Sequence, residues 1–129
     1  MKSFLAVTAL LVFTVFASNV SAQHQAQRIT GIYSSLRFNA ESGDLSGTEL
    51  LIIPANPGYI AFVQLAEGDV PSVAVVPVSV SGSRIEFTMP LDAVPGGFRF
   101  TGSIEGDKLV GRWQDRGQEV LRRGKSYWH

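Results

Sequence analysis

The chain has 129 residues, with 11 basic and 11 acidic side chains that are spread without long runs of either sign. This balance excludes the electrostatic footprint of a protein that binds nucleic acid or an anionic membrane surface. The chain contains no cysteine, so disulfide bonds and a cysteine-linked lipid anchor are excluded as well.

The first 22 residues have the pattern of a secretory signal peptide. Lys2 precedes a largely apolar run over residues 4–17, and Val20-Ser21-Ala22 matches a small-residue cleavage site. The apolar run is shorter than the roughly 20 residues that a membrane-spanning helix needs. We therefore expect a cleavable signal peptide rather than a membrane anchor.

This reading predicts a protein exported by the secretory pathway, with no membrane attachment after cleavage. Its destination would be the periplasm in a Gram-negative bacterium and the extracellular space otherwise. The first mature residues, 23–27, are polar and lack periodicity, which predicts a flexible N-terminus. The remaining segment, 28–129, has the size of one domain with its own core.

The mature chain has the pattern of an all-β protein. From Arg28 onward, apolar and β-branched residues occur in short runs separated by Gly, Pro, Asp and Ser, which is typical of strands joined by tight turns. No segment has a persuasive helical period. The predicted strands lie near 29–38, 48–54, 59–66, 73–80, 84–89, 98–105, 108–114 and 118–123.

The segment 73–89 predicts a β-hairpin around Gly82-Ser83. A two-residue turn with glycine in its first central position fixes the register of the flanking strands. The pairs then sort into an apolar face, with Val80/Ile85, Val78/Phe87 and Val76/Met89, and a second face, with Ser79/Glu86 and Pro77/Thr88. Because proline lacks a backbone N–H, we expect Pro77 at a free or bulged position.

A second hairpin is predicted around Gly106-Asp107. Its turn pairs Glu105 with Lys108 on the solvent side and gives an inner face of Ile104/Leu109, Gly102/Gly111 and Phe100/Trp113. Two glycines that face each other in mid-strand indicate a sharp bend or space for a neighbouring ring. We therefore favour a closed barrel over an open sheet or a sandwich.

The next turn, over residues 115–117, is predicted as a three-residue loop with Gly117 left-handed, which would place Leu121 beside Gly111. The whole pattern predicts a single small antiparallel up-and-down β-barrel of about eight strands. A membrane barrel would need strands of about 9–11 residues with apolar outer faces. The runs here are mostly shorter, and the polar faces carry charged residues such as Glu86 and Arg99.

No catalytic residue, metal site or cofactor site is predicted. The two histidines, His24 and His129, lie near the ends of the mature chain, and cysteine is absent, so neither a transition-metal site nor a Ser-His-Asp triad is favoured. The acidic residues at 41–44 and 67–69 lack the ligand density of a calcium loop and are better explained by turn formation. The sequence thus favours a protein that is not an enzyme.

Aromatic residues of the predicted strands are candidates for lining a pocket inside the barrel. They are Tyr33, Tyr59, Phe87, Phe98, Phe100 and Trp113. The same rings could instead fill the core, as side chains usually do in small barrels. The sequence leaves both interiors open.

Gly31-Ile32-Tyr33 resembles the Gly-x-Trp pattern that opens the first strand of lipocalins and avidins, the calycin group. In lipocalins that ring lies at the closed end of the barrel, under an arginine from near the last strand. The resemblance implies a ligand-binding barrel and makes Arg122 and Arg123 the candidates for this barrel-end arginine. Tyrosine stands here in place of tryptophan, and the loops are shorter than in lipocalins.

Three functional hypotheses follow. The first is an exported, non-enzymatic protein that binds a small apolar molecule inside the barrel. The second is a protein-interaction or inhibitor module, because residues 50–53 and 59–65 are apolar on both faces. The outer of these two faces must be covered, either by the loop 67–72 or by a second molecule. That molecule would be a partner protein or the other half of a homodimer. The third is a small hydrolase with paired carboxylates at the barrel mouth.

Overall fold

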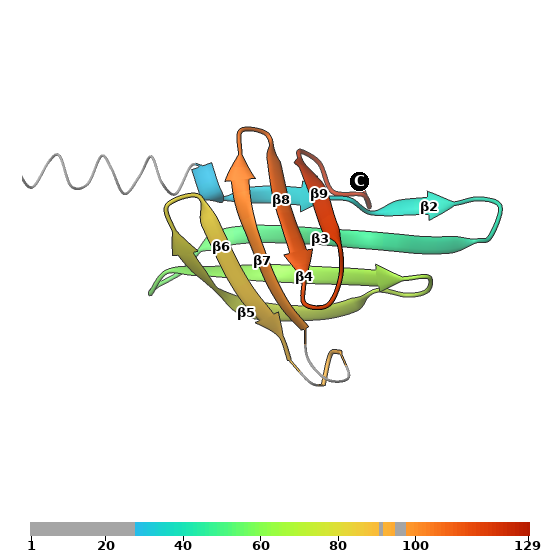
Figure 1. Cartoon of the computed structure of the whole chain (residues 1–129), viewed down its shortest axis with the longest axis horizontal. Coiled ribbons are helices and arrows are strands. Elements are labelled where there is room, and N and C mark those ends of the chain that lie inside the picture. The colour runs from blue at the N-terminus through green and yellow to red at the C-terminus, as the bar shows by residue number, and fades with distance from the viewer. Residues whose placement is uncertain (1–27, 91, 95–97) are drawn as a thin grey trace, which may run out of the picture.

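A single antiparallel sheet winds into a closed barrel in the computed structural model, which describes residues 28–90, 92–94 and 98–129 (Figure 1). The predicted signal peptide, 1–22, and the predicted flexible segment, 23–27, lie outside the described residues. The strands of the described part are β1 (Gly31–Ser34), β2 (Arg37–Asn39), β3 (Asp44–Pro54), β4 (Tyr59–Glu67), β5 (Ser72–Ser81), β6 (Arg84–Met89), β7 (Phe98–Glu105), β8 (Lys108–Trp113) and β9 (Gln118–Arg123).

Strand β1 closes the barrel because it pairs on one edge with β9 and on the other with β3. The strands from β3 to β9 each pair with the next one along the chain, so eight strands form an up-and-down barrel and β2 is an additional strand. The predicted fold class is confirmed for the described residues. Among these residues, no helix has the length and apolarity required to cross a membrane.

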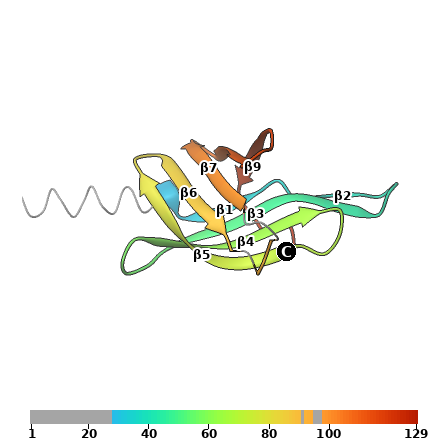
Figure 2. The ribbon, with the colours of Figure 1, turned by 60° about the horizontal axis from the view of Figure 1, so that its bottom comes forward.

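The predicted strand 29–38 is split in two. Both β1 and β2 pair with the same edge of the long strand β3, which begins at Asp44 rather than at the predicted residue 48. Between them, the Ser35 N–H donates to the Thr48 carbonyl at 2.8 Å. The β2–β3 hairpin extends beyond the barrel (Figures 1 and 2).

The predicted β7–β8 hairpin is confirmed pair by pair. Its ladder runs from Glu105/Lys108 through Ile104/Leu109 and Gly102/Gly111 to Phe100/Trp113. The ring of Phe100 occupies the space over the two glycines, where a Cβ on Gly102 would lie 3.1 Å from its Cε1 atom. The paired glycines therefore make room for a large ring.

The β5–β6 hairpin is confirmed near its turn, where the ladder contains Ser81/Arg84, Val80/Ile85 and Ser79/Glu86. The predicted pairs Val78/Phe87 and Val76/Met89 are not part of this ladder, although all four side chains are buried. Going away from the turn, the last paired residue of β5 is Ser79, two positions from Pro77, which has no N–H to donate. From there β5 remains paired with β4.

The predicted register of the last hairpin is wrong by two residues. Leu121 lies opposite Leu109, and Glu119 lies opposite Gly111, because five residues, 113–117, rather than the predicted three separate the last paired residues, Arg112 and Gln118. Asp115, with φ 62°, takes the left-handed conformation that was expected of Gly117. A shift of two residues keeps every side chain on its predicted face, so Leu121 still points inward.

The barrel interior is filled by one apolar cluster to which all eight barrel strands contribute. Its members alternate along each strand with outward-facing residues, as a pleated strand requires. Removing this apolar surface from water is the main stabilising contribution in a protein without disulfide bonds. The fully buried members with the largest side chains include Tyr33, Phe100, Ile29, Leu50 and Ile52.

Candidate binding site at the barrel mouth

A pocket of about 690 Å³ lies at the end of the barrel where β8 turns into β9. Four segments that are distant in sequence line it: Ser35 and Arg37, residues 46–48 of β3, residues 65–67 of β4, and Trp113 with residues 116–120. The pocket is therefore a product of barrel closure, which brings β3 and β4 next to the β8–β9 turn.

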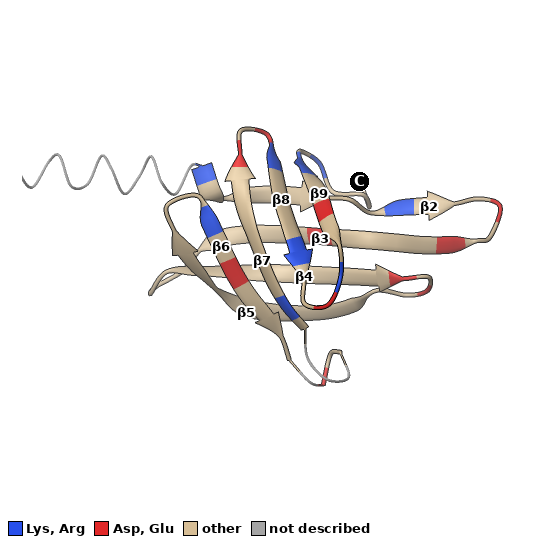
Figure 3. Cartoon of the chain, viewed as in Figure 1, with Lys and Arg blue, Asp and Glu red and all other residues tan. Residues whose placement is uncertain are grey.

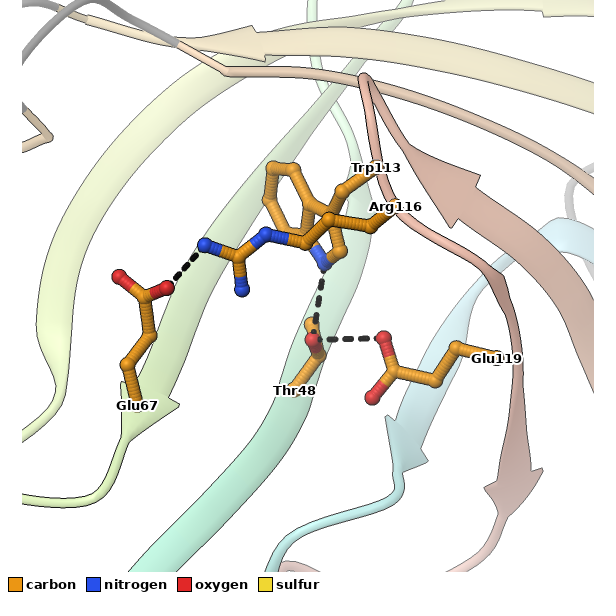
Figure 4. Close-up of polar contacts among 5 residues, drawn as sticks. All are labelled: Thr48, Glu67, Trp113, Arg116 and Glu119. Atoms are coloured by element: carbon orange, nitrogen blue, oxygen red, sulfur yellow. Dashed lines mark hydrogen bonds and ion pairs between the residues drawn. The ribbon is translucent and has the colours of Figure 1, made fainter.

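The floor of this pocket is a chain of hydrogen bonds around Thr48, whose side chain is fully buried. The Trp113 Nε1–H donates to Thr48 Oγ1 at 3.0 Å, and Thr48 Oγ1 donates to Glu119 Oε2 at 3.0 Å (Figure 4). Ser35 Oγ donates to the other oxygen of Glu119, and the Thr48 N–H donates to Ser35 Oγ at 2.9 Å. Each side chain in this network therefore has a hydrogen-bond partner within the network.

Glu119 is the charged member of this network and is half-buried. Its inner position follows from strand alternation with Leu121, and its partner across the ladder is Gly111. Two hydroxyl groups donate to its carboxylate, whereas the ion pairs among the described residues do not include it. Partial burial of a carboxylate costs desolvation free energy, and no ion pair among the described residues compensates this cost for Glu119.

Arg116 crosses the mouth from the β8–β9 turn. Its guanidinium forms an ion pair with Glu67 at the end of β4, and its Cζ atom lies 4.8 Å from the centre of the Phe98 ring. Figure 4 shows Arg116 reaching toward Glu67 in the neighbourhood of Trp113. The guanidinium thus combines a carboxylate contact with a cation–π contact.

Four of the predicted pocket-lining aromatic residues come together in one cluster. The rings of Phe87 and Phe100 stack with centres 5.0 Å apart, and both meet Trp113 edge to face at 5.6 and 5.1 Å. The centre of the Phe98 ring lies 6.4 Å from the centre of the Trp113 ring. Of the six predicted residues, Trp113 alone lines the mouth pocket described above.

The other two predicted aromatic residues lie apart from this cluster. Tyr59 is half-buried and packs against the core. Tyr33 is fully buried, and its hydroxyl donates to the carbonyl of Ile29 at 3.0 Å. Burial raises the pKa of Tyr33 above its ordinary value, and the nearby Arg123 partly opposes this effect.

Of the two predicted barrel-end arginines, Arg123 is the one that lies over an aromatic ring. Its Cζ atom is 5.5 Å from the centre of the Tyr33 ring, and its guanidinium donates to the Thr30 carbonyl. The Arg123 N–H donates to the Asp107 carbonyl, which places this contact beside the β7–β8 turn. Arg122 is exposed on the outer face.

Two carboxylates, Glu67 and Glu119, line the mouth pocket, as the hydrolase hypothesis requires. Each has a partner within the protein, since Glu67 pairs with Arg116 and Glu119 accepts hydrogen bonds from Ser35 and Thr48. Within the described residues, no group of three or more His, Cys, Asp or Glu side chains is placed to hold a metal ion.

Sequence reasoning missed most of the mouth: Ser35, Thr48, Glu67, Arg116 and Glu119 were not among the predicted site residues. One signal was available for Glu119, because an acidic residue two positions before the inward-facing Leu121 must share its face. The partnership with Thr48 had no such signal, since it depends on barrel closure between segments 71 residues apart.

The described residues thus form an eight-stranded antiparallel barrel with one additional strand and a polar pocket at its mouth. No protein-family model, no curated protein and no solved structure matches the chain.

Proposed function

We propose that this chain is an exported binding protein whose ligand site is the barrel mouth rather than the barrel interior. The observation that carries the proposal is the half-buried Glu119 carboxylate, which lies in an open pocket with hydroxyl partners and no ion pair among the described residues. Ligand sites typically combine a concave surface with a few converging polar groups.

The interior is a less suitable site because it is occupied by the protein's own rings. A ligand there would have to separate Phe87, Phe100 and Trp113, which pack at centre distances of 5.0 to 5.6 Å. The calycin resemblance supports a ligand site at one end of a barrel, with the weight of a fold analogy. The ligand of the first hypothesis therefore changes from an apolar molecule inside to a more polar one at the mouth.

Trp113 provides the test because its indole ring contributes to the pocket wall and donates to Thr48. The chain has two tryptophans, and the exposed Trp128 can be removed as Trp128→Phe, so that emission comes from Trp113 alone. We expect a saturable change in Trp113 emission with members of a panel of small amines, alcohols, amides and carboxylates.

Two charge-neutralising variants locate the binding. Glu119→Gln should weaken the response about tenfold, the loss expected for one charge-assisted hydrogen bond. Glu86→Gln on the outer face is the matched control and should leave it unchanged, because Glu86 pairs with Arg99 outside the pocket. No response across the panel, or a response that survives Glu119→Gln, would reject the mouth as the site.

A second candidate function, a protein-interaction module, is favoured by the outer surface of β3, β4 and β5. Cross-strand rows place Leu51, Phe62 and Val75 side by side, with exposed fractions of 38%, 41% and 64%. We call the outward-facing Leu51, Ile53, Phe62, Val73 and Val75 the apolar outer face. Contiguous exposed apolar residues are typical of interaction sites.

The loop 67–72 does not cover this face, contrary to one prediction, because Phe62 and Val75 remain exposed. The C-terminal residues cover one end of it instead, where Ser126 Oγ donates to Glu49 at 2.5 Å and Trp128 Nε1–H donates to Gln64 at 2.9 Å. We propose a second copy of this chain as the occupant. The charged residue in these rows, Glu49, is buried and accepts hydrogen bonds from Ser126 Oγ and the Tyr127 N–H, so two copies can approach without exposed like charges meeting.

A further inference from the structure

We propose that the mouth pocket is a site for a cationic nitrogen group, an ammonium or guanidinium, and that Arg116 is an intramolecular occupant that such a ligand displaces. This inference rests on the proposed function, since it names the ligand class of the same pocket. Three features of the mouth carry it: the contacts of Arg116, the sum of charges, and the fixed position of Glu119.

The contacts of Arg116 are those that proteins use to hold a cationic ligand. Its guanidinium meets the carboxylate of Glu67 on one side and the face of the Phe98 ring, at 4.8 Å, on another. Side chains of this ion pair keep 40% and 44% of their surface exposed, so the pair contributes little to folding stability. The Arg116 side chain can therefore move away from Glu67 with little loss of folding stability.

The charges of the pocket favour a cation in its place. Four ionisable side chains line the pocket, Arg37, Glu67, Arg116 and Glu119, and their formal charges cancel. When Arg116 swings out, the pocket is left with one excess negative charge, because Arg37 alone remains against two carboxylates. A ligand with a single positive charge restores the balance, whereas an anion meets both carboxylates.

Glu119 supplies a second, preorganised anchor. Ser35 and Thr48 each donate to a different oxygen of its carboxylate, and Thr48 is in turn held by Trp113. An ionised carboxylate has about four lone-pair sites, so it can accept further N–H groups from a ligand. A carboxylate already held in place loses little conformational freedom on binding.

The experiment titrates the Trp128→Phe protein with butylguanidinium, butylammonium, butanol and butyrate while Trp113 emission is recorded. We expect saturable binding of the two cations and none of butanol or butyrate at the same concentrations. A blocked peptide, acetyl-Gly-Arg-Gly-amide, forms a separate arm. Tighter binding of the peptide than of butylguanidinium identifies an arginine side chain of a partner protein as the source, and equal or weaker binding identifies a small molecule.

Variants of Arg116 test the displacement. Arg116→Gln removes the competing charge and should strengthen butylguanidinium binding by about two- to fivefold, since a competing occupant reduces apparent affinity by the fraction of time it is bound. Arg112→Gln, on the outer face of β8 and outside the pocket, is the matched control and should change nothing. Glu67→Gln should weaken binding about tenfold.

The outcomes separate this inference from the proposed function. Saturable binding of butanol or butyrate in preference to the cations, with sensitivity to Glu119→Gln, would overturn the cation site and leave the mouth as a ligand site. Weaker butylguanidinium binding by Arg116→Gln, with the melting temperature unchanged, would make Arg116 part of the site and overturn its role as occupant. Absence of binding by every probe contradicts both proposals.

Discussion

Gly111 and Phe100 show how tightly side chains pack in this barrel, because the Phe100 ring fills the space that a side chain at Gly111 would need. A Cβ added at Gly111 would collide with the Phe100 ring, and one added at Gly102 would lie 2.8 Å from Leu109 Cδ1. We expect Gly111→Ala to lower the free energy of unfolding by about 1–3 kcal/mol, as overpacking of a core does. Urea unfolding measures this change.

Gly117→Ala is the control for this prediction, because a Cβ there meets no atom within 4 Å. Its effect should stay within about 0.5 kcal/mol, as is usual for surface substitutions. Combining Gly111→Ala with Phe100→Leu should cost less than the sum of the two single changes, since the smaller side chain removes the collision. Equal stability of the two alanine variants would contradict the packing of Phe100 over Gly111.

Tyr33 makes the stability of the barrel depend on alkaline pH. Its pKa in the folded protein is raised above the ordinary value of 10.0 by burial, with Arg123 acting in the opposite direction. Above pH 10 the unfolded chain therefore loses this proton before the folded protein does, and the free energy of unfolding falls as pH rises toward the folded pKa. Below pH 10 the contribution is fully present.

The change to make is Tyr33→Phe, which removes the titrating hydroxyl together with its hydrogen bonds. The absolute stability falls for both reasons, so the informative quantity is the slope of unfolding free energy against pH between pH 9 and 11. We expect this slope to be less negative in Tyr33→Phe than in the original protein. Identical slopes would show that Tyr33 takes no part in the alkaline loss of stability.

Among the strands, the accuracy of sequence-based prediction follows the length of the turns. The β7–β8 ladder could be predicted residue by residue because the Gly106-Asp107 turn fixes its register. The β8–β9 register could not, since a five-residue connection, 113–117, with Asp115 left-handed differs from the predicted turn. The break between β1 and β2 depends on the approach of Ser35 to Gly47, which no local pattern encodes.

The candidate site likewise combines features that follow from the local strand pattern with contacts that do not. Burial of Phe87, Phe100 and Trp113 could be predicted because strand alternation places them on one face. The hydrogen bond from Trp113 to Thr48 joins β8 to β3, which are not neighbours in the sheet. Contacts of this kind require the tilt and closure of the barrel, and these are set by all strands together.

Thr48 is the residue that joins these elements at the mouth. Thr48→Val keeps the shape of the side chain but leaves the Trp113 N–H without its acceptor and Glu119 without one donor. We expect a loss of about 1–3 kcal/mol in unfolding free energy, the cost of an unsatisfied buried polar group. Thr88→Val, at an exposed position of β6, is the control and should be nearly neutral in the same chemical unfolding experiment.

On the scale of the whole molecule, charged and apolar residues occupy different surfaces although the net charge is zero. Charged residues of both signs lie along β6, β7, β8 and β9 and their turns, and further acidic residues lie at the tips of the β2–β3 and β4–β5 hairpins (Figure 3). Between them, the middle parts of β3, β4 and β5 present the apolar outer face. The balanced composition conceals this segregation, because a sum over the chain contains no information on faces.

The apolar outer face predicts self-association that is weak and concentration-dependent. Three strands about 4.8 Å apart and three outward rows about 6.8 Å apart span roughly 14 by 20 Å, well below the about 800 Å² per partner of a standard interface. We therefore expect a monomer at low micromolar concentration and a growing dimer fraction toward millimolar concentration, measured by sedimentation equilibrium.

Phe62 lies in the central row of the face, so Phe62→Lys should abolish this dimer by placing two like charges at its centre. Val120→Lys is the matched control, because Val120 is exposed to a similar extent, 45% against 41%, but lies on β9 outside the face. A dimer that persists in Phe62→Lys would have to use another surface. A strict monomer at millimolar concentration would reject a second copy as the occupant of this face.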